Sequence, residues 1–230
     1  MTMTSNFIWF ILLLVMVASY LIQNILNSRF DKYSRIPTPG GMTGADIARK
    51  MLNDFGIHNV KVEHVSGKLT DHYNPQTKTL NLSDAVYGSA SIAAAAVAAH
   101  ECGHAVQHAW QYGPLQMRSA LVPVVSFASK FVSIVLIAGV IFIETFPTLL
   151  WIGIALFATT TIFSIITLPV EINASSRAIA WLGKSNIVDA QTKPMAKDAL
   201  KWAAYTYVIA ALGSIATLIY YISIANGRRR

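Results

Sequence analysis

The stretch AAHECGHAVQ at positions 98–107 brings three ionisable side chains into an alanine-rich segment. If this segment is helical, His100 and His104 lie one turn apart on the same face, with their imidazoles side by side. Glu101 lies about 100° further round the helix. This HExxH pattern predicts a zinc site with two histidine ligands and a glutamate that acts as general base. The alternative is a hydrogen-bonded histidine pair buried on an amphipathic helix.

A catalytic zinc ion takes three protein ligands and one water, so a third ligand is expected elsewhere in the chain. The chain has four glutamates. Glu101 already has a role, Glu63 lies on a predicted strand, and Glu144 lies in a predicted turn between two membrane spans. Glu171 directly follows the third predicted span, and two crossings return the chain to the side of the histidines. We therefore expect Glu171 to complete a site for one zinc ion.

Three other side chains are weaker candidates for the metal. His108 extends the histidine series by another turn. Positions 100 and 108 are about 12 Å apart along a straight helix, so three such turns rarely converge on one ion. We expect His108 to make a polar contact at the helix end instead. The remaining acidic options are Asp71 and Asp189.

The composition places these residues in a membrane protein. Of the 230 residues, 54% are hydrophobic and only 13% are charged, and the mean hydropathy is +0.47. Soluble domains carry about 25% charged residues. The net charge of +7 is therefore interpreted as basic loops at a membrane surface, and not as nucleic-acid binding, for which no basic helix or stacking motif is present. Segments long enough to cross a bilayer are predicted at about 7–26, 127–143, 148–168 and 202–224.

A polar insert between the first two spans carries the HExxH stretch. Helical spacing of apolar residues after Thr43 predicts a helix that ends at Gly56. Two strands are predicted around Val60–Val65 and Thr79–Leu82. The alanine-rich helix is expected to begin after Ser83 or Ser91 and to stop at Gly113-Pro114.

The predicted fold is mainly α and integral to the membrane: four transmembrane helices with a small α+β zincin-like polar insert that carries HExxH. The segments follow in chain order. They are an anchor at 1–26, the insert at 27–118, a transmembrane hairpin at 119–170, a loop or helix with the third metal ligand at 171–201, and a last transmembrane helix with a basic tail at 202–230.

The HExxH stretch, together with LTDHYNP at 69–75, LNLS at 80–83, PVEINASSR at 169–177 and AAYTYV at 203–208, resembles bacterial YugP-type zinc metallopeptidases. The resemblance covers most of the chain from about Pro39 onward and implies a membrane protease. That family is similar, more distantly, to gluzincin membrane proteases that pair HExxH with a later Glu-x-x-x-Asp. This likeness implies that Glu171 is the third ligand. Ser175 replaces that aspartate. Ser175 or Asn173 is therefore expected to orient a ligand in its place.

Peptide hydrolysis needs, besides Glu101 as base, a donor for the developing oxyanion. Arg177 lies six residues after Glu171, near the metal if that segment is helical, although contact with a lipid headgroup is the simpler role. His72 is a second candidate, with Tyr73 beside it, although both precede a turn at Asn74-Pro75 that they would stabilise.

The expected function is that of a membrane-embedded zinc endopeptidase with peptide or membrane-protein substrates, in contact with the lipid bilayer and without nucleic acid. A rival function is non-hydrolytic zinc binding, as in a metal sensor or an assembly factor. The sequence predicts no oligomeric state. A multi-pass location in the cell membrane is expected, with the zinc site on the cytoplasmic face, because basic residues follow the first and third spans. Arg228–Arg230 point the other way.

Overall fold

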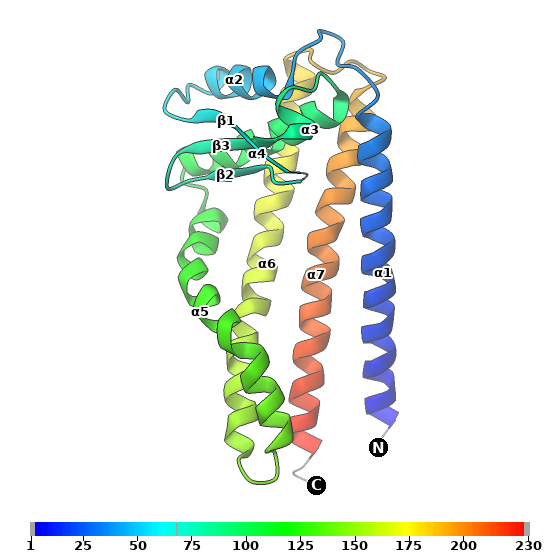
Figure 1. The fold of residues 1–230 in the computed structure, drawn as a ribbon, viewed down its shortest axis with the longest axis vertical. Helices are drawn as coiled ribbons and strands as arrows, with labels where there is room; N and C mark the ends of the chain where they lie inside the picture. The colour runs from blue at the N-terminus through cyan, green and yellow to red at the C-terminus, as the bar shows by residue number, and fades with distance from the viewer. Residues whose placement is uncertain (1–2, 68, 228–230) are drawn as a thin grey trace. The chain divides into compact units, whose positions relative to one another are not determined.

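Figure 1 shows the fold in a computed structural model, which describes residues 3–67 and 69–227. The predicted basic tail Arg228–Arg230 lies outside the described residues. The described chain is mainly helical with one small sheet, as the sequence predicts. Its elements are α1 (Met3–Tyr33), α2 (Gly44–Asp54), β1 (Lys61–Val65), β2 (His72–Asn74), β3 (Thr79–Ser83), α3 (Asp84–Tyr87), α4 (Ile92–Ala109), α5 (Gly113–Ile141), α6 (Pro147–Lys184) and α7 (Lys193–Gly227).

Internal contacts divide the chain into two compact units. Unit 1 comprises Met1–Leu21, Gln116–Leu168 and Thr206–Arg230, and unit 2 comprises Ile22–Leu115 and Pro169–Tyr205.

Four helices in the described part of the chain are long and apolar enough to cross a membrane, judged by length and composition. They are Phe7–Tyr33 within α1, then α5, α6 and α7 over their full lengths, with mean hydropathies of 2.0 to 2.3 in their most apolar windows. Each overlaps one of the four spans predicted from the sequence, and the span predicted at 127–143 extends two residues past the end of α5. This confirms the number and order of the long apolar helices.

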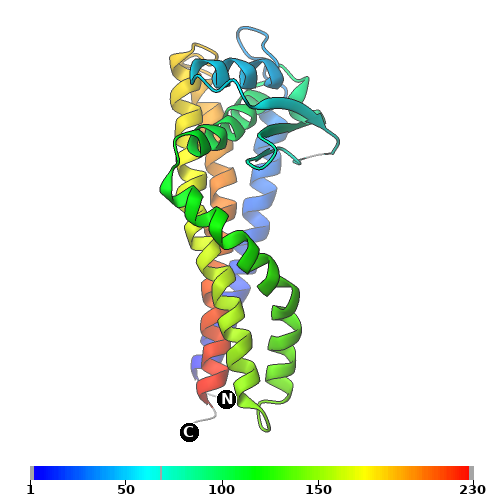
Figure 2. The ribbon, with the colours of Figure 1, turned by 90° about the vertical axis from the view of Figure 1, so that its left-hand side faces the viewer.

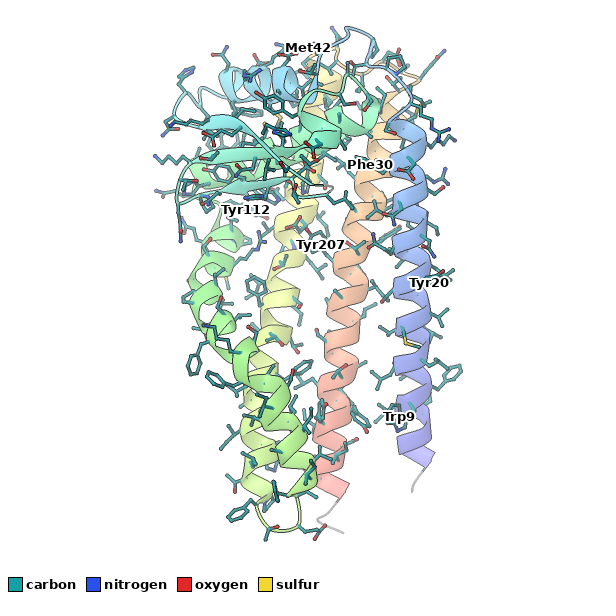
Figure 3. The ribbon with its side chains drawn as sticks, viewed as in Figure 1. Trp9, Tyr20, Phe30, Met42, Tyr112 and Tyr207 are labelled. Carbon is teal, nitrogen blue, oxygen red and sulfur yellow. The ribbon has the colours of Figure 1, made fainter. Side chains whose placement is uncertain are left out.

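Unit 1 has a thin core and many exposed apolar side chains. Gly139 lets α5 approach α6 closely, because a Cβ at this position would lie 2.6 Å from the Cα of Leu150. On α1, Trp9 is 52% exposed and Tyr20 is 69% exposed, and both project from the helix in Figure 3. Exposed apolar surface of this extent marks a contact with lipid or with another apolar partner.

Three helices extend further than the predicted membrane spans. Gly113-Pro114 interrupts the helical structure only briefly, because Pro114 lies in the first turn of α5, where its missing N–H costs no hydrogen bond. Similarly, α6 continues to Lys184, and α7 begins at Lys193. Most of 171–201 is therefore helix, and only 185–192 form the connection.

The extension of α6 has a physical cause in a stripe of buried side chains. Val170, Ala174, Ala178 and Leu182 recur every four residues and are fully buried. Such a stripe lies on one face of a helix and buries it against the core. Gly103 on α4 permits this contact, because a Cβ there would lie 2.7 Å from the carbonyl oxygen of Ala174.

The core of unit 2 is built around α4. Figure 2 shows α4 running beneath α2, with the sheet beside it. Ser91 caps the start of α4 by accepting a hydrogen bond from the backbone N–H of Ala94. The alanine side chains of α4 are almost all fully buried, so α2 and the sheet can pack close to its axis. Thr43 and Asp46 form a capping box at the start of α2, so this helix begins after Thr43 as the sequence predicts.

The sheet has the strand order β1-β3-β2. The predicted strands β1 and β3 are confirmed and pair in parallel, with Val62 opposite Leu80. The short edge strand β2 was not predicted, because His72–Asn74 carry no apolar alternation. It pairs antiparallel to β3, with His72 opposite Asn81.

Candidate metal centre

The histidine pair of α4 has the arrangement that the sequence predicts. His100 and His104 lie on successive turns of one helix, with ring centroids 4.8 Å apart. His104 is buried and His100 is half-buried. The two imidazoles therefore face one point inside unit 2.

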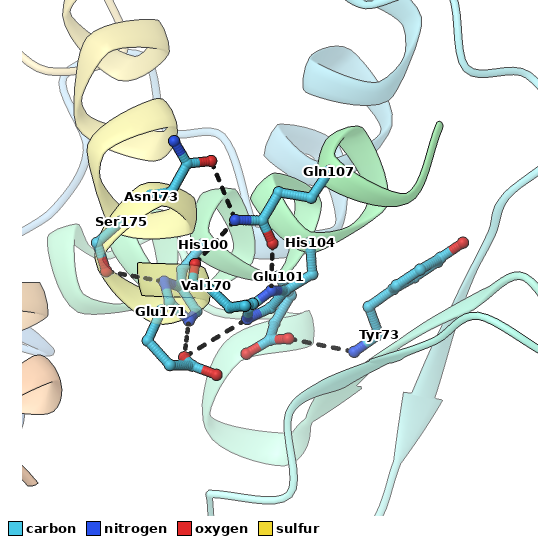
Figure 4. Close-up of polar contacts among 9 residues, drawn as sticks. All are labelled: Tyr73, His100, Glu101, His104, Gln107, Val170, Glu171, Asn173 and Ser175. Atoms are coloured by element: carbon cyan, nitrogen blue, oxygen red, sulfur yellow. Dashed lines mark hydrogen bonds and ion pairs between the residues drawn. The ribbon is translucent and has the colours of Figure 1, made fainter. Parts of the chain in front are cut away.

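Glu171 on α6 reaches the same point. Its Oε2 lies 3.3 Å from Nε2 of His100 and 3.6 Å from Nε2 of His104. The side chain is almost completely buried, with the residue only 2% exposed. Figure 4 shows the carboxylate facing both rings. The structure thus brings together the three residues that the sequence suggested as metal ligands.

These three side chains fit a zinc ion. Their ligand atoms all lie within 4.8 Å of one another. Zinc bound tetrahedrally at 2.0–2.2 Å holds neighbouring ligand atoms about 3.4 Å apart. The two distances from the carboxylate to the imidazoles match that separation. Two imidazoles and one carboxylate are also a ligand set that leaves the fourth position open in catalytic zinc sites.

The other ring nitrogens are held by hydrogen bonds that turn both Nε2 atoms toward Glu171. Nδ1 of His100 lies 3.0 Å from the hydroxyl of Ser175. Nδ1 of His104 lies 3.0 Å from Oε1 of Gln107. Partners of this kind fix the tautomer and the orientation of a metal-binding histidine. Of the two candidates for orienting a ligand, Ser175 therefore makes a direct contact with a histidine of the pair.

Gln107 is the member of this network that the sequence analysis missed. It is fully buried, and its amide nitrogen donates to the carbonyl oxygen of Val170 at 2.8 Å and to Oδ1 of Asn173 at 3.0 Å. Because both donor positions are used on α6, Oε1 is left to face His104. The signal was present in the spacing, since Gln107 follows His104 by three residues and shares its face.

Glu101 lies at the site with one carboxylate oxygen anchored. Its Oε2 accepts a hydrogen bond of 3.1 Å from the backbone N–H of Tyr73, on the edge strand β2 (Figure 4). Only a backbone contact with β2 provides this anchor, so no side-chain pattern could have predicted it. The bond fixes the carboxylate and leaves its second oxygen for other contacts.

The charges of the site favour a cation. Burial disfavours the charged form of His104, but the hydrogen bond with Glu171 and the nearby charge of Glu101 hold the pKa of His104 above its usual value. The neighbouring Cys102 plays no part in the ligand set. It is fully buried against Ala48, and burial raises the pKa of its thiol well above the usual range.

Two predicted catalytic residues make structural contacts. Arg177 donates from Nε to Oδ1 of Asn173 at 2.7 Å, and its guanidinium lies 4.8 Å from the ring centroid of Trp110. Both ring nitrogens of His72 are engaged: Nδ1 with the carbonyl oxygen of Thr70 at 2.8 Å and Nε2 with Asn81 at 3.2 Å. These contacts favour positioning roles for both residues.

The weaker metal candidates lie in other contacts. Nδ1 of His108 lies 2.8 Å from the hydroxyl of Tyr73, which is the polar contact expected at the helix end. Asp71 accepts hydrogen bonds from the backbone and hydroxyl of Ser83. Asp189 accepts hydrogen bonds from the backbone N–H groups of Gln191 and Thr192 in the connection between α6 and α7.

Two histidines and a buried carboxylate, with a further glutamate beside them, form a group that could hold a metal ion and that has the ligand types of a catalytic zinc site. The chain belongs to the family described as "Putative neutral zinc metallopeptidase", whose profile matches residues 8–226. It is 41% identical over 211 residues to the "Putative membrane protease YugP" of Bacillus subtilis (strain 168), covering 91% of this chain and 93% of that protein. No solved structure matches the chain.

Replacement of Gln107 by leucine is expected to weaken zinc binding by roughly 10–100-fold. Leucine keeps the volume but removes the acceptor on Nδ1 of His104 and the two donors to α6. Competition with a chromophoric chelator on the detergent-solubilised protein measures the affinity. His108→Ala is the matched control on the same helix and is expected to keep zinc. Unchanged affinity in Gln107→Leu, or loss of zinc in His108→Ala, would contradict this account of the ligand shell.

Proposed function

We propose that the protein is a membrane-embedded endopeptidase that hydrolyses peptide bonds with one zinc ion held by His100, His104 and Glu171. The observation that carries the proposal is the convergence of these three side chains next to Glu101. Membership of the family and the four long apolar helices support it. The zincin-like character of the insert, with its HExxH helix beside an edge strand, belongs to the same proposal.

The proposed roles follow from what each residue can do. Zinc bound here supplies a Lewis acid that activates water and polarises the scissile carbonyl group. Glu101 takes the proton from the attacking water and delivers it to the nitrogen of the leaving amine. The N–H of Tyr73 holds one oxygen of Glu101 in place, so the carboxylate is oriented before substrate arrives. Ser175 and Gln107 keep both imidazoles aimed at the metal.

The oxyanion roles of Arg177 and His72 stay predictions within this proposal. Because the carbonyl of Thr70 can only accept, Nδ1 of His72 carries its proton, and Nε2 accepts from Asn81. His72 would donate to an oxyanion only after it exchanged one of these bonds. Arg177 connects to His104 through Asn173 and Gln107, which makes positioning its better-supported role.

Removal of zinc is expected to abolish peptide cleavage. Purified protein in detergent would be treated with a chelator, dialysed and assayed on a quenched fluorescent peptide library. One equivalent of Zn²⁺ is expected to restore the rate, and Mg²⁺ is expected to leave it at background, because two imidazole ligands suit zinc and not magnesium. Cleavage that persisted in verified metal-free protein would overturn the proposal.

We also propose that the site faces the cytoplasm. Positive residues concentrate on cytoplasmic sides of membrane proteins. The hairpin turn that holds Glu144 has no basic residue. Basic residues follow the first span closely and recur after the third span, and they are Arg29, Lys32, Arg35, Arg177, Lys184, Lys193, Lys197 and Lys201. Four crossings would put Arg228–Arg230 on the other side of the membrane, but these three residues weigh less than the two basic flanks.

Cysteine labelling in intact cells tests this orientation. A reagent that does not cross the membrane is expected to label Thr145→Cys in the hairpin turn and to leave Lys193→Cys unlabelled until the cells are lysed. The only native thiol, Cys102, is fully buried and provides little background. Labelling of Lys193→Cys in intact cells, with Thr145→Cys protected, would place the site outside.

A further inference from the structure

A groove between α6 and α7 in unit 2 is lined by none of the three proposed metal ligands. It has a volume of about 470 Å³. Its floor is apolar, with Ile172 and Ile179 from α6 and Leu200 from α7. Its polar lining includes Lys193, Lys197 and Lys201.

The three lysines put positive charge along the groove. They follow at intervals of four residues and so share one face of α7. Like charges at this spacing repel each other and destabilise a helix. No carboxylate is among the residues that line the groove. Asp198, the acidic residue between them in sequence, binds Arg29 at 3.3 Å and the hydroxyl of Tyr33 at 2.8 Å. The charge pattern is therefore suited to an anionic ligand.

The apolar floor indicates what kind of anion fits. A small soluble phosphate would use the lysines but not the isoleucine and leucine side chains. Along α6, Ile172 follows the predicted apolar span by four residues, and on α7 Ala204 lies within the apolar span predicted at 202–224. The lining residues therefore occur where each helix passes into its apolar segment, which is the level at which lipid headgroups meet a membrane protein.

We propose that this groove binds the headgroup of an anionic phospholipid. Lys193, Lys197 and Lys201 bind the phosphate, and the apolar floor receives the first part of an acyl chain. Ser175 lies in the lining of the groove and also bonds to Nδ1 of His100 at 3.0 Å. A bound lipid consequently borders a metal ligand. This last consequence rests on the proposed function, whereas lipid binding itself does not.

Lipid binding is measured on the intact protein in neutral detergent micelles by native mass spectrometry, with phosphatidylglycerol against phosphatidylcholine as the added lipid. Wild type is expected to prefer phosphatidylglycerol. The triple variant Lys193→Gln, Lys197→Gln, Lys201→Gln is expected to bind phosphatidylglycerol at least about tenfold more weakly, since each basic residue near an anionic surface contributes measurably. The matched control removes three other exposed lysines: Lys32→Gln, Lys61→Gln, Lys78→Gln. It is expected to keep the preference.

A second variant tests the groove without any change of charge. Ser176 is exposed in the lining, and Ser176→Trp would fill the groove while keeping all three lysines. It is expected to lose phosphatidylglycerol binding as well. Equal binding in the triple variant and wild type, or equal loss in the control triple, would overturn the proposal. Full displacement of the lipid by millimolar glycerol 3-phosphate would also overturn it, because the groove would then be a site for a soluble phosphate. These readouts need no peptide cleavage, so a failure of the proposed function leaves them unchanged.

Discussion

Replacement of Glu101 by glutamine is expected to lower peptide cleavage by roughly 10²–10⁴-fold, which is the contribution of a positioned general base. Glutamine has nearly the same shape, and its amide oxygen can still accept the hydrogen bond from the N–H of Tyr73. It cannot take a proton from water. Bound zinc is therefore expected to stay, because Glu101 is not one of the three ligands. Initial rates on a fluorescent peptide and zinc content by elemental analysis measure the two quantities.

The matched control for this substitution is Glu63→Gln. Glu63 is exposed on β1, and it lies opposite Asn81 in the sheet. The substitution makes the same chemical change at a residue outside the ligand set. The Glu63→Gln protein is expected to cleave the peptide at the wild-type rate. A Glu101→Gln protein that cleaved peptides as fast as wild type would remove Glu101 from the mechanism.

Replacement of Glu171 has the largest expected effect on the metal itself. Glu171→Gln removes the charge that faces both Nε2 atoms, and Glu171→Ala removes the side chain altogether. We expect zinc affinity to fall by more than the roughly 10–100-fold that the loss of an outer hydrogen-bond partner costs. Cleavage is expected to fall with it. Equilibrium dialysis against buffered zinc measures the occupancy.

Glu144→Ala is the control for Glu171, because Glu144 lies in the connection between α5 and α6 and outside the ligand set. It is expected to keep wild-type zinc content. The Gln variant of Glu171 preserves volume in the core, so a loss of zinc at an unchanged melting temperature separates ligation from folding. Zinc loss in Glu144→Ala together with full zinc in Glu171→Gln would show that the assignment of the third ligand is wrong.

The parts of the site that sequence predicted correctly are those set by local geometry or by counting membrane crossings. The pairing of His100 with His104 needs only the pitch of a helix. The choice of Glu171 needs only that two membrane crossings return the chain to the side of the histidines, and that the chain has few glutamates. Both follow from spacing, without knowledge of side-chain packing.

The parts that sequence did not predict depend on tertiary contacts. The anchor of Glu101 is a backbone N–H of β2, a strand of three residues that pairs only because β3 is beside it. Gln107 finds its partners on α6, more than sixty residues away. The continuation of α6 past residue 171 is stabilised by burial of Val170, Ala174 and Ala178, and Gly103 on α4 leaves space for it. The polar composition of this segment had left both a loop and a helix open.

In the proposed reaction, water attacks a peptide bond at the centre formed by the two histidines, Glu171 and Glu101. Cleavage of a defined peptide in water enriched in ¹⁸O tests it most directly, with wild type and Glu101→Gln both loaded with one equivalent of zinc. Wild type is expected to produce a new carboxyl terminus that carries one ¹⁸O atom, detected by mass spectrometry, and Glu101→Gln is expected to produce almost none. Equal amounts of labelled product from both proteins, or a wild-type product without the label, would contradict the account.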